Sequence, residues 1–217
     1  VAGGADDTVL NIQNLKTKNV DNPSNPTAFS VFAESYAGGL VGTMGNTSFH
    51  VEDIDLKHTV DGETSEVKVV TSGGAGVGGL FGQSVKQGAD CSLKNISIQC
   101  PVRVVGSGKY CGGLIGYLKL NKVLTVQRCE STSIVSGDEA VGGMIGEVNM
   151  EGGGSIALDG LIKNHVLVSN GAASSVKGRE TVGGFIGAFK SGSLTVKNLE
   201  IATSVSCTEN NVGGLMG

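Results

Sequence analysis

The residues of this sequence best suited to chemistry are carboxylates in two short acidic groups. One group contains Glu52, Asp53 and Asp55, and the other pairs Asp138 with Glu139. Two carboxylates flanking a glycosidic bond act as acid and nucleophile in glycoside hydrolysis, so these groups raise the hypothesis of a polysaccharide lyase or hydrolase. Neither group has an acidic counterpart one sequence repeat away that would complete a cluster. We therefore interpret them as solvated edges and predict no catalytic residue.

Histidine and cysteine are too dispersed to predict a metal site. His50, His58 and His165 do not converge in the sequence, and no paired-cysteine or calcium-loop motif accompanies them. We expect these histidines to face solvent, and we expect no metal or cofactor. The cysteines stand largely where apolar residues recur in other repeats, which favours buried free thiols over disulfide bridges. They are Cys91, Cys100, Cys111, Cys129 and Cys207.

Two asparagines begin N-glycosylation sequons, Asn46-Thr-Ser and Asn95-Ile-Ser. Asn46 follows a glycine-rich turn, so it is the candidate acceptor if the protein passes through a eukaryotic secretory pathway. Asn95 falls where Asn or Asp recurs along the chain, and we interpret it as a turn residue.

Composition excludes several classes of partner. The 16 basic and 20 acidic residues give a net charge of −4, and Lys and Arg are not clustered as in a nucleic-acid-binding surface. No apolar run reaches the roughly 18 residues of a membrane-spanning helix. The sequence begins at Val1 without an initiator methionine or a signal pattern, so we expect a processed or excerpted segment.

One glycine-rich hexapeptide recurs along the chain and defines its organisation. A small apolar residue is followed by two glycines, two larger apolar residues and a third glycine. The copies are AGGLVG (37–42), VGGLFG (77–82), CGGLIG (111–116), VGGMIG (141–146), VGGFIG (182–187) and VGGLMG (212–217). We expect their glycines to allow turns through positive φ in every repeat. The motif glycines are Gly38, Gly39, Gly42, Gly78, Gly79, Gly82, Gly112, Gly113, Gly116, Gly142, Gly143, Gly146, Gly183, Gly184, Gly187, Gly213, Gly214 and Gly217.

A second motif lies between the hexapeptides and has the form apolar-x-apolar-x-x-apolar. Its copies are LNIQNL (10–15), FHVEDI (49–54), CSLKNI (91–96), LTVQRC (124–129), IALDGL (156–161) and LTVKNL (194–199). The extra residue before the third apolar position breaks the two-residue period of a strand, and we interpret the break as a corner. Asn and Asp tolerate left-handed backbone angles. The slot is filled by Asn14, Asp53, Asn95 and Asn198, and by Arg128 and Gly160 in the other two copies.

The repeats predict parallel strands stacked in register. Repeats one to six begin near residues 10, 49, 91, 124, 156 and 194, and their central apolar residues are 39, 42, 33, 32 and 38 positions apart. The recurring segments are short, alternating and rich in β-branched residues, whereas interior glycine disfavours a helix by about 1 kcal/mol. We predict an all-β fold, a single right-handed parallel β-helix or β-solenoid over 1–217, with about six coils of 32–42 residues.

The hexapeptides, each combined with an apolar strand and an Asn-centred turn, resemble GLUG-motif repeats. The resemblance covers residues 10–217. GLUG repeats occur in large secreted and cell-surface proteins, including adhesin-like proteins and the non-catalytic regions of bacterial IgA-cleaving peptidases. The resemblance therefore implies a β-solenoid in an extracellular or cell-surface setting, and it implies no catalytic activity for the repeats themselves.

The segments between the two motifs vary in length, which raises the hypothesis that recognition occurs there, although the sequence identifies no binding residue. Extra residues lie around Asp21–Glu34, Asp61–Ser72 and Ser169–Arg179. Insertions in solenoids often gather on one binding face, although length variation in tolerant surface loops is the alternative interpretation. We predict a non-catalytic structural or adhesin-like segment, a rigid stalk or a surface that binds protein or glycan on a cell or matrix surface.

The two ends of the sequence raise the hypothesis of self-assembly. The last hexapeptide stops without a polar cap, and the opening VAGG resembles part of another copy. Strand edges left bare in this way template pairing, so either more chain or another copy of the molecule is expected to stack there.

Overall fold

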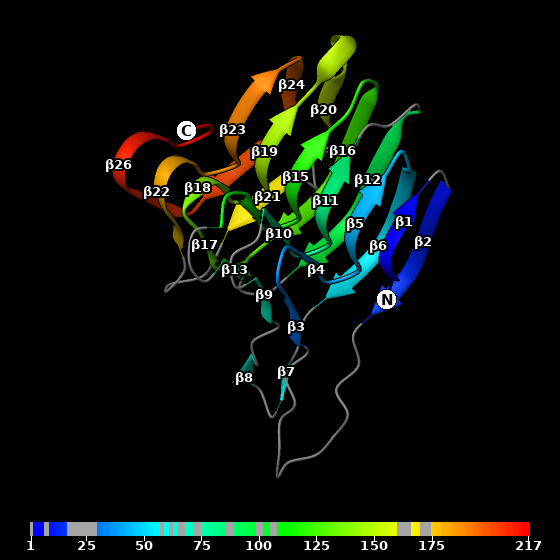
Figure 1. Cartoon of the computed structure of the whole chain (residues 1–217), viewed down its shortest axis with the longest axis horizontal. Coiled ribbons are helices and arrows are strands. Elements are labelled where there is room, and N and C mark those ends of the chain that lie inside the picture. Colours follow the sequence, from blue (N-terminus) through cyan, green and yellow to red (C-terminus); the bar gives the residue numbers. More distant parts are fainter. Residues whose placement is uncertain are drawn as a thin grey trace.

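The structure is all-β, and its three large sheets are each built from strands of successive sequence repeats (Figure 1). This computed structural model describes residues 2–6, 9–16, 30–56, 59–60, 63–64, 68–71, 75–85, 89–98, 102–104, 108–159, 166–169 and 175–217. Pairing within these three sheets is parallel throughout. Among the described strands only the hairpin of β7 (Thr59–Val60) and β8 (Glu63–Thr64) is antiparallel. One 3-10 turn, η1 (Glu151–Gly153), interrupts the strands.

Sheet A contains the second half of each hexapeptide. Its strands, in spatial and chain order, are β1 (Ala2–Asp6), β5 (Val41–Gly45), β11 (Phe81–Val85), β15 (Ile115–Lys119), β19 (Ile145–Asn149) and β23 (Ile186–Ser191). They follow one another from blue to orange in Figure 1. Ala2 is the partner of Val41, so β1 occupies the level before the first hexapeptide. Met216 continues the sheet beyond β23 through an isolated bridge to Ile186.

Sheet B contains the second motif. Its main path consists of β2 (Val9–Lys16), β6 (Ser48–Leu56), β12 (Cys91–Ile98), β16 (Val123–Ser131), β20 (Ser155–Asp159) and β24 (Ser193–Lys197), and β21 (Val166–Ser169) and β25 (Leu199–Ala202) extend it. The central apolar residues of the motif are direct partners from each repeat to the next. They are Ile12, Val51, Leu93, Val126, Leu158 and Val196. The in-register stacking predicted from the repeat spacing is therefore confirmed.

Repeat five departs from the predicted motif. The sequence pattern placed Gly160 in the corner slot and Leu161 at the third apolar position, and both lie outside the described residues. In the structure Val166 is the partner of Leu199, the third apolar residue of repeat six. Val166 thus holds the level of the third apolar residue in sheet B, and the assignment of Leu161 stays a prediction.

Sheet C contains the variable segments and the first half of each hexapeptide. The variable segments supply β3 (Ser30–Ala33), β9 (Lys68–Thr71), β13 (Val102–Val104) and β17 (Val135–Ser136), and the hexapeptides supply β4 (Tyr36–Gly38), β10 (Gly76–Gly78), β14 (Cys111–Gly112) and β18 (Glu139–Gly142). In repeats five and six each strand spans both parts, as β22 (Ser175–Gly183) and β26 (Ser204–Gly213). Because β17 pairs with the start of β22 and β18 with its end, the two rows join into one sheet.

The predicted insertion loops are only partly loops. Strand β3 lies within Asp21–Glu34, and β8 and β9 lie within Asp61–Ser72. Ser169 ends β21, and β22 begins at Ser175 and runs through Arg179, so the prediction of one loop over Ser169–Arg179 is wrong. The segment pairs in parallel with β17 and β26, which makes it part of a sheet. The other residues of the three predicted loops fall largely outside the described ranges.

A ladder of backbone hydrogen bonds connects the hexapeptides. The amide of the fourth motif residue donates to the carbonyl of its counterpart in the next repeat, with N···O distances of 3.0, 2.9, 2.8, 2.9 and 3.0 Å. These fourth residues are Leu40, Leu80, Leu114, Met144, Phe185 and Leu215. Every level of the ladder therefore fixes the same register.

The motif glycines are required by close backbone approach and not by positive φ. Among the described glycines, positive φ is confined to three that lie outside the hexapeptides, Gly152, Gly153 and Gly192. A Cβ on Gly112 would overlap the carbonyl oxygen of Ile115 and lie 2.7 Å from the amide nitrogen of Gly146. A Cβ on Gly82 would lie 2.5 Å from the carbonyl oxygen of Gly42. The prediction of turns through positive φ at these glycines is therefore wrong, since their role is to let neighbouring backbones touch.

The corner slot is where the backbone adopts left-handed angles. The residues and their φ values are Asn14 (56°), Asp53 (56°), Asn95 (52°), Arg128 (51°) and Asn198 (53°). Strand β6 continues through Asp53, yet Val51 and Ile54 on either side of it are both buried. A left-handed residue therefore shifts the strand alternation by one position and keeps both apolar neighbours in the core.

Columns of apolar side chains fill the space between the sheets. Phe49 of sheet B and Phe81 of sheet A are both fully buried, and their ring centroids lie 5.0 Å apart. Full burial of one such side chain stabilises the fold by about 1.5–3 kcal/mol. The columns are most deeply buried in the middle repeats, whereas β24 and β26 of repeat six leave most of their residues exposed.

Candidate binding surface

The acidic group of repeat two is spread along the outer face of sheet B. Asp53 is exposed, and the side chains of Glu52 and Asp55 are partly exposed. Glu52 has Lys94 as its partner in the next repeat, and Asp55 has Lys16 in the previous one. Glu52 and Asp55 therefore each have a lysine as partner in an adjacent repeat.

Side-chain polar contacts on the same face connect repeats two and three. Asn95 Nδ2 donates to Asp53 Oδ1 at 2.7 Å, and the exposed His50 ring lies with Nδ1 3.0 Å from Ser92 Oγ. His50 faces solvent, as the sequence predicted. His58 and His165 lie outside the described residues.

Asp138 and Glu139 belong to a charged cluster that the sequence reading missed. Arg179 Nε lies 2.5 Å from Asp138 Oδ1, and Arg179 Nη1 lies 2.9 Å from Glu209 Oε2. Glu180 also pairs with this guanidinium, and Glu139 Oε1 lies 3.4 Å from Nη2. One arginine thus joins four carboxylates from three successive repeats.

The cluster corrects the expectation that these carboxylates have no acidic counterpart one repeat away. Glu139 and Glu180 are direct partners in sheet C. Both residues lie two positions before a hexapeptide, so aligning the hexapeptides would have revealed this match from the sequence. Hydrogen bonding and charge from Arg179 hold the pKa of Asp138 below its ordinary value. A carboxylate with a lowered pKa, such as that of Asp138, is poorly suited to act as the protonated acid of a glycosidase.

Three of the cysteines are buried free thiols. Cys91, Cys111 and Cys129 are each at most 1% exposed and unbridged, as the sequence predicted. Burial raises the pKa of Cys91 to about 11 and that of Cys129 to about 12. At neutral pH these thiols stay protonated and pack as small apolar groups. Cys207 is a free thiol of intermediate burial, and Cys100 lies outside the described residues.

Asn46 is exposed in the turn between β5 and β6, with φ of 47°. Its place on the surface is compatible with glycan attachment, which stays a prediction. Asn95, the second sequon asparagine, is the left-handed corner residue of β12, as the sequence indicated.

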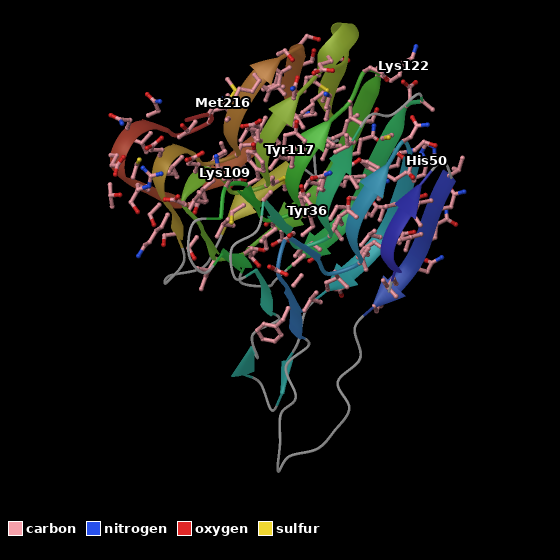
Figure 2. All side chains as sticks on the ribbon, in the orientation of Figure 1. Tyr36, His50, Lys109, Tyr117, Lys122 and Met216 are labelled. Carbon is pink, nitrogen blue, oxygen red and sulfur yellow. The ribbon has the colours of Figure 1, made fainter. Side chains whose placement is uncertain are left out.

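The tyrosines of the chain gather on one face, which the sequence reading did not single out. We call Tyr36, Tyr110 and Tyr117 the tyrosine surface; the chain has 3 tyrosines and no tryptophan. All are partly exposed, and Tyr36 and Tyr117 lie on the same side of the molecule in Figure 2. The ring centroids of Tyr110 and Tyr117 are 4.9 Å apart, with the rings inclined at 34°.

The positions of Tyr36 and Tyr110 follow from the repeat. Each precedes a hexapeptide directly, so they occupy one column, two repeats apart. Gly76 holds this slot in repeat two, where it is the partner of Tyr36, and the amide of Val77 donates to the carbonyl of Tyr110 at 2.8 Å. Aligning the residue before each hexapeptide would have revealed this column from the sequence.

Polar groups border the tyrosine surface. Glu147 is the partner of Tyr117 in the next repeat, and its side chain is 12% exposed. Burial is the main cause that raises the pKa of Glu147, and the Lys190 ammonium 4.0 Å away opposes the shift. Burial also raises the pKa values of Tyr110 and Tyr117, and the negative charge of Glu147 adds to both shifts.

A cavity of about 450 Å³ lies at the end of β15, two residues beyond Tyr117. It is lined by Lys119, Leu120, Asn121, Glu151 and Gly152. Lys119 Nζ and Glu151 Oε1 form an ion pair of 2.9 Å at its rim. The tyrosine surface and this cavity therefore adjoin along one strand.

The described residues contain no group of three or more His, Cys, Asp or Glu side chains placed to hold a metal ion. Within the same residues, no helix is long and apolar enough to cross a membrane. No family model matches the chain, and neither a curated protein nor a solved structure matches it.

Proposed function

We propose that this chain is a non-catalytic segment of a secreted or cell-surface protein, related to the GLUG-motif repeats, that acts as a rigid stalk or binding surface. Its parallel sheets are proposed to form one right-handed β-solenoid of about six coils. The observation that carries this proposal is the hydrogen-bond ladder, in which the fourth residue of each hexapeptide bonds to the next at 2.8–3.0 Å.

Rigidity follows from the repetition of this contact. Each repeat is joined to its neighbours by backbone hydrogen bonds in three sheets and by continuous apolar columns. In such an array, stability is approximately the sum of repeat and interface terms, so bending requires several interfaces to yield together. A structure of this kind suits a spacer that holds other parts of a surface protein apart.

The charge pattern supports a non-catalytic role. The carboxylates on sheet B alternate with basic residues, and those of the Arg179 cluster are bound to the guanidinium. The test is incubation of the protein with a panel of acidic and neutral polysaccharides. We expect no cleavage, whereas new reducing ends or unsaturated uronate products would support the alternative, a polysaccharide lyase or hydrolase.

End-to-end stacking is a separate part of the proposal. Val212 in β26 is 57% exposed and Met216 is 39% exposed, although their counterparts Val182 and Ile186 are fully buried. Another layer of the same kind would cover them. Analytical ultracentrifugation should show association that rises with concentration and is lost in Val212→Lys. A monomer at high concentration would contradict stacking and leave the stalk role standing.

A further inference from the structure

The tyrosine surface has the chemistry of a glycan-binding platform, and we propose that it binds a neutral, β-linked polysaccharide. This inference rests on the proposed role as a binding surface and adds the class of ligand. It is argued from three observations, which are the spacing of the tyrosines, the polar groups around them and the pairing of the nearby charges.

The spacing provides two stacking positions along one line. Tyr36 and Tyr110 are in one column, two repeats apart, which at about 4.8 Å per layer separates them by about 10 Å. Gly76 lies between them, and a Cβ there would come within 3.1 Å of Tyr36 Cδ1. Gly76 is buried and the Tyr36 ring lies against it, so the two partly exposed rings are the contact points that this line offers a ligand. Two sugar units of an extended β-linked chain span a comparable length.

Stacking on tyrosine suits the face of a pyranose ring. The aromatic face carries negative partial charge, and the axial C–H groups of a sugar present a weakly positive, apolar surface. Tyr110 and Tyr117, with centroids 4.9 Å apart, form two adjoining ring surfaces inclined to each other. Tyrosine loses little conformational entropy on binding, because only two side-chain torsions are fixed.

Hydroxyl groups of a stacked sugar would meet polar partners at the edge of the rings. Tyr117 shares a hydrogen bond with the Asn149 side chain, and Glu147 lies beside it with its carboxylate largely removed from water. A carboxylate accepts strong hydrogen bonds from hydroxyls, and these gain strength where water is excluded. The cavity of about 450 Å³ beside Lys119 falls within the size range of small-ligand sites. It offers space for a further sugar unit or a branch.

The carboxylates beside the tyrosines each have a cationic partner, which favours a neutral ligand. Glu147 pairs with Lys190, Glu139 with Lys109, and Glu151 with Lys119. An acidic polysaccharide would need unpaired cations, and a cationic partner would need unpaired carboxylates. These pairs leave neither unpaired cations nor unpaired carboxylates, so a neutral polyol chain suits the surface better than an acidic polysaccharide or a cationic partner.

Intrinsic tyrosine fluorescence tests the proposal directly, because the chain has no tryptophan to mask it and all 3 tyrosines lie at the proposed site. The protein is titrated with cellohexaose and, separately, with hexa-N-acetylchitohexaose, both of which are uncharged. We expect a saturable change in tyrosine emission with at least one of the two. No change with either up to their solubility limits would overturn the proposal.

Variants then locate the binding. Tyr117→Ala and Tyr36→Ala should each weaken binding about tenfold, as loss of one stacked aromatic of about 1.4 kcal/mol predicts. Calorimetry serves as the readout, since these variants alter the fluorescence. Phe32→Ala is the matched control, because Phe32 is 73% exposed in β3 and outside the surface. It should leave affinity unchanged. Equal affinity in Tyr117→Ala and the parent protein would reject the site.

Conservative changes keep the test valid if an alanine variant fails to fold. Tyr110→Phe retains the ring and should change affinity less than threefold, whereas Glu147→Gln removes the charged acceptor and should weaken binding. Thermal unfolding of each variant separates folding from binding. Saturable binding of heparin in place of the neutral oligosaccharides would also contradict the proposal, because it requires excess positive charge.

The two proposals fail in different ways. Cleavage of a bound oligosaccharide would refute the non-catalytic role and keep the site. A folded, stacked protein that binds neither oligosaccharide would remove the glycan site and leave the structural role intact.

Discussion

Each repeat changes direction with two different devices, the hexapeptide turn and the corner slot. The hexapeptide uses glycine without positive φ, whereas the corner adopts positive φ at Asn14, Asp53 and Asn95 without glycine. At the hexapeptide the limiting factor is space, because a Cβ on Gly38 would lie 2.6 Å from the carbonyl oxygen of Leu80. At the corner the limiting factor is the left-handed backbone conformation, because a side chain there has space toward solvent or a neighbouring repeat. The hexapeptide turn therefore requires a small residue, whereas the corner slot requires a residue that tolerates left-handed backbone angles.

The largest expected effect comes from adding a methyl group inside the hexapeptide turn. A Cβ on Gly184 would overlap the carbonyl oxygen of Gly214 and lie 2.9 Å from Ile201 Cγ2. Gly184→Ala should lower the free energy of unfolding by about 4 kcal/mol, the upper range for a single substitution. Denaturant unfolding followed by circular dichroism measures the change.

Gly214→Ala is the matched control for that substitution. Gly214 holds the same motif slot in repeat six, where a Cβ would meet nothing within 4 Å. Its effect should stay within about 0.5 kcal/mol. Equal losses at the two positions would mean that backbone conformation, and not space, selects glycine in this slot.

Removing Asn from a corner should have an intermediate effect. Asn95 has φ of 52° and donates to Asp53. Asn95→Ala should cost about 1 kcal/mol, because alanine disfavours left-handed angles. Asn95→Gly should cost less, since glycine adopts these angles freely. A larger loss for glycine than for alanine would contradict the conformational explanation.

Residues poorly suited to left-handed angles offer a gain in stability. Arg128 has φ of 51° in the corner column, and Thr181 has φ of 54° in a second left-handed column with Ala140 and Asn211. A β-branched residue is rarely found at positive φ. Thr181→Asn and Arg128→Asn should each stabilise the protein by about 0.5–1 kcal/mol. Unchanged or lowered melting temperatures would show that side-chain contacts outweigh the backbone preference.

The smallest effect should be the pH dependence of the Arg179 cluster. Arg179 lowers the pKa of Asp138 below the ordinary 3.8, so the ionised carboxylate stabilises the fold above that pH. This contribution is lost as the pH falls below 3.8 toward the lowered pKa. Asp138→Asn should therefore reduce the drop in melting temperature on acidification. The same drop in the variant and the parent would place the pH dependence elsewhere.

The repeat spacing predicted much of the fold. Hydrophobic period and motif distance are local properties, so the partners of Val51 and Leu93 followed from counting residues. The repeat spacing did not reveal why glycine is required in the hexapeptides, because a clash with the next repeat depends on how closely the two backbones approach. The pairing of Glu139 with Glu180 could have been found by aligning the hexapeptides, whereas the place of Glu209 could not, because a register shift separates repeat six from repeat five.

The tyrosine surface also combines a feature that the sequence contains with one that depends on how the sheets pack. Its column was present in the sequence, because Tyr36 and Tyr110 hold one motif slot. Its contact with Tyr117 depends on how sheet A lies against sheet C, which no spacing within one repeat specifies. Polar residues such as Glu52 and Asp55 were prominent in sequence, yet sheet B spreads them along a surface where they alternate with lysines.

Successive hexapeptides stack in register through hydrogen bonds between their fourth residues. Scalar couplings across these hydrogen bonds test the stacking directly. In a triple-resonance experiment on the uniformly labelled chain, the Leu80 amide nitrogen should correlate with the Leu114 carbonyl, 2.9 Å away. The Leu114 amide should correlate with the Met144 carbonyl, 2.8 Å away. Correlations of these amides to carbonyls of other motif slots, or within their own repeat, would contradict the in-register stacking.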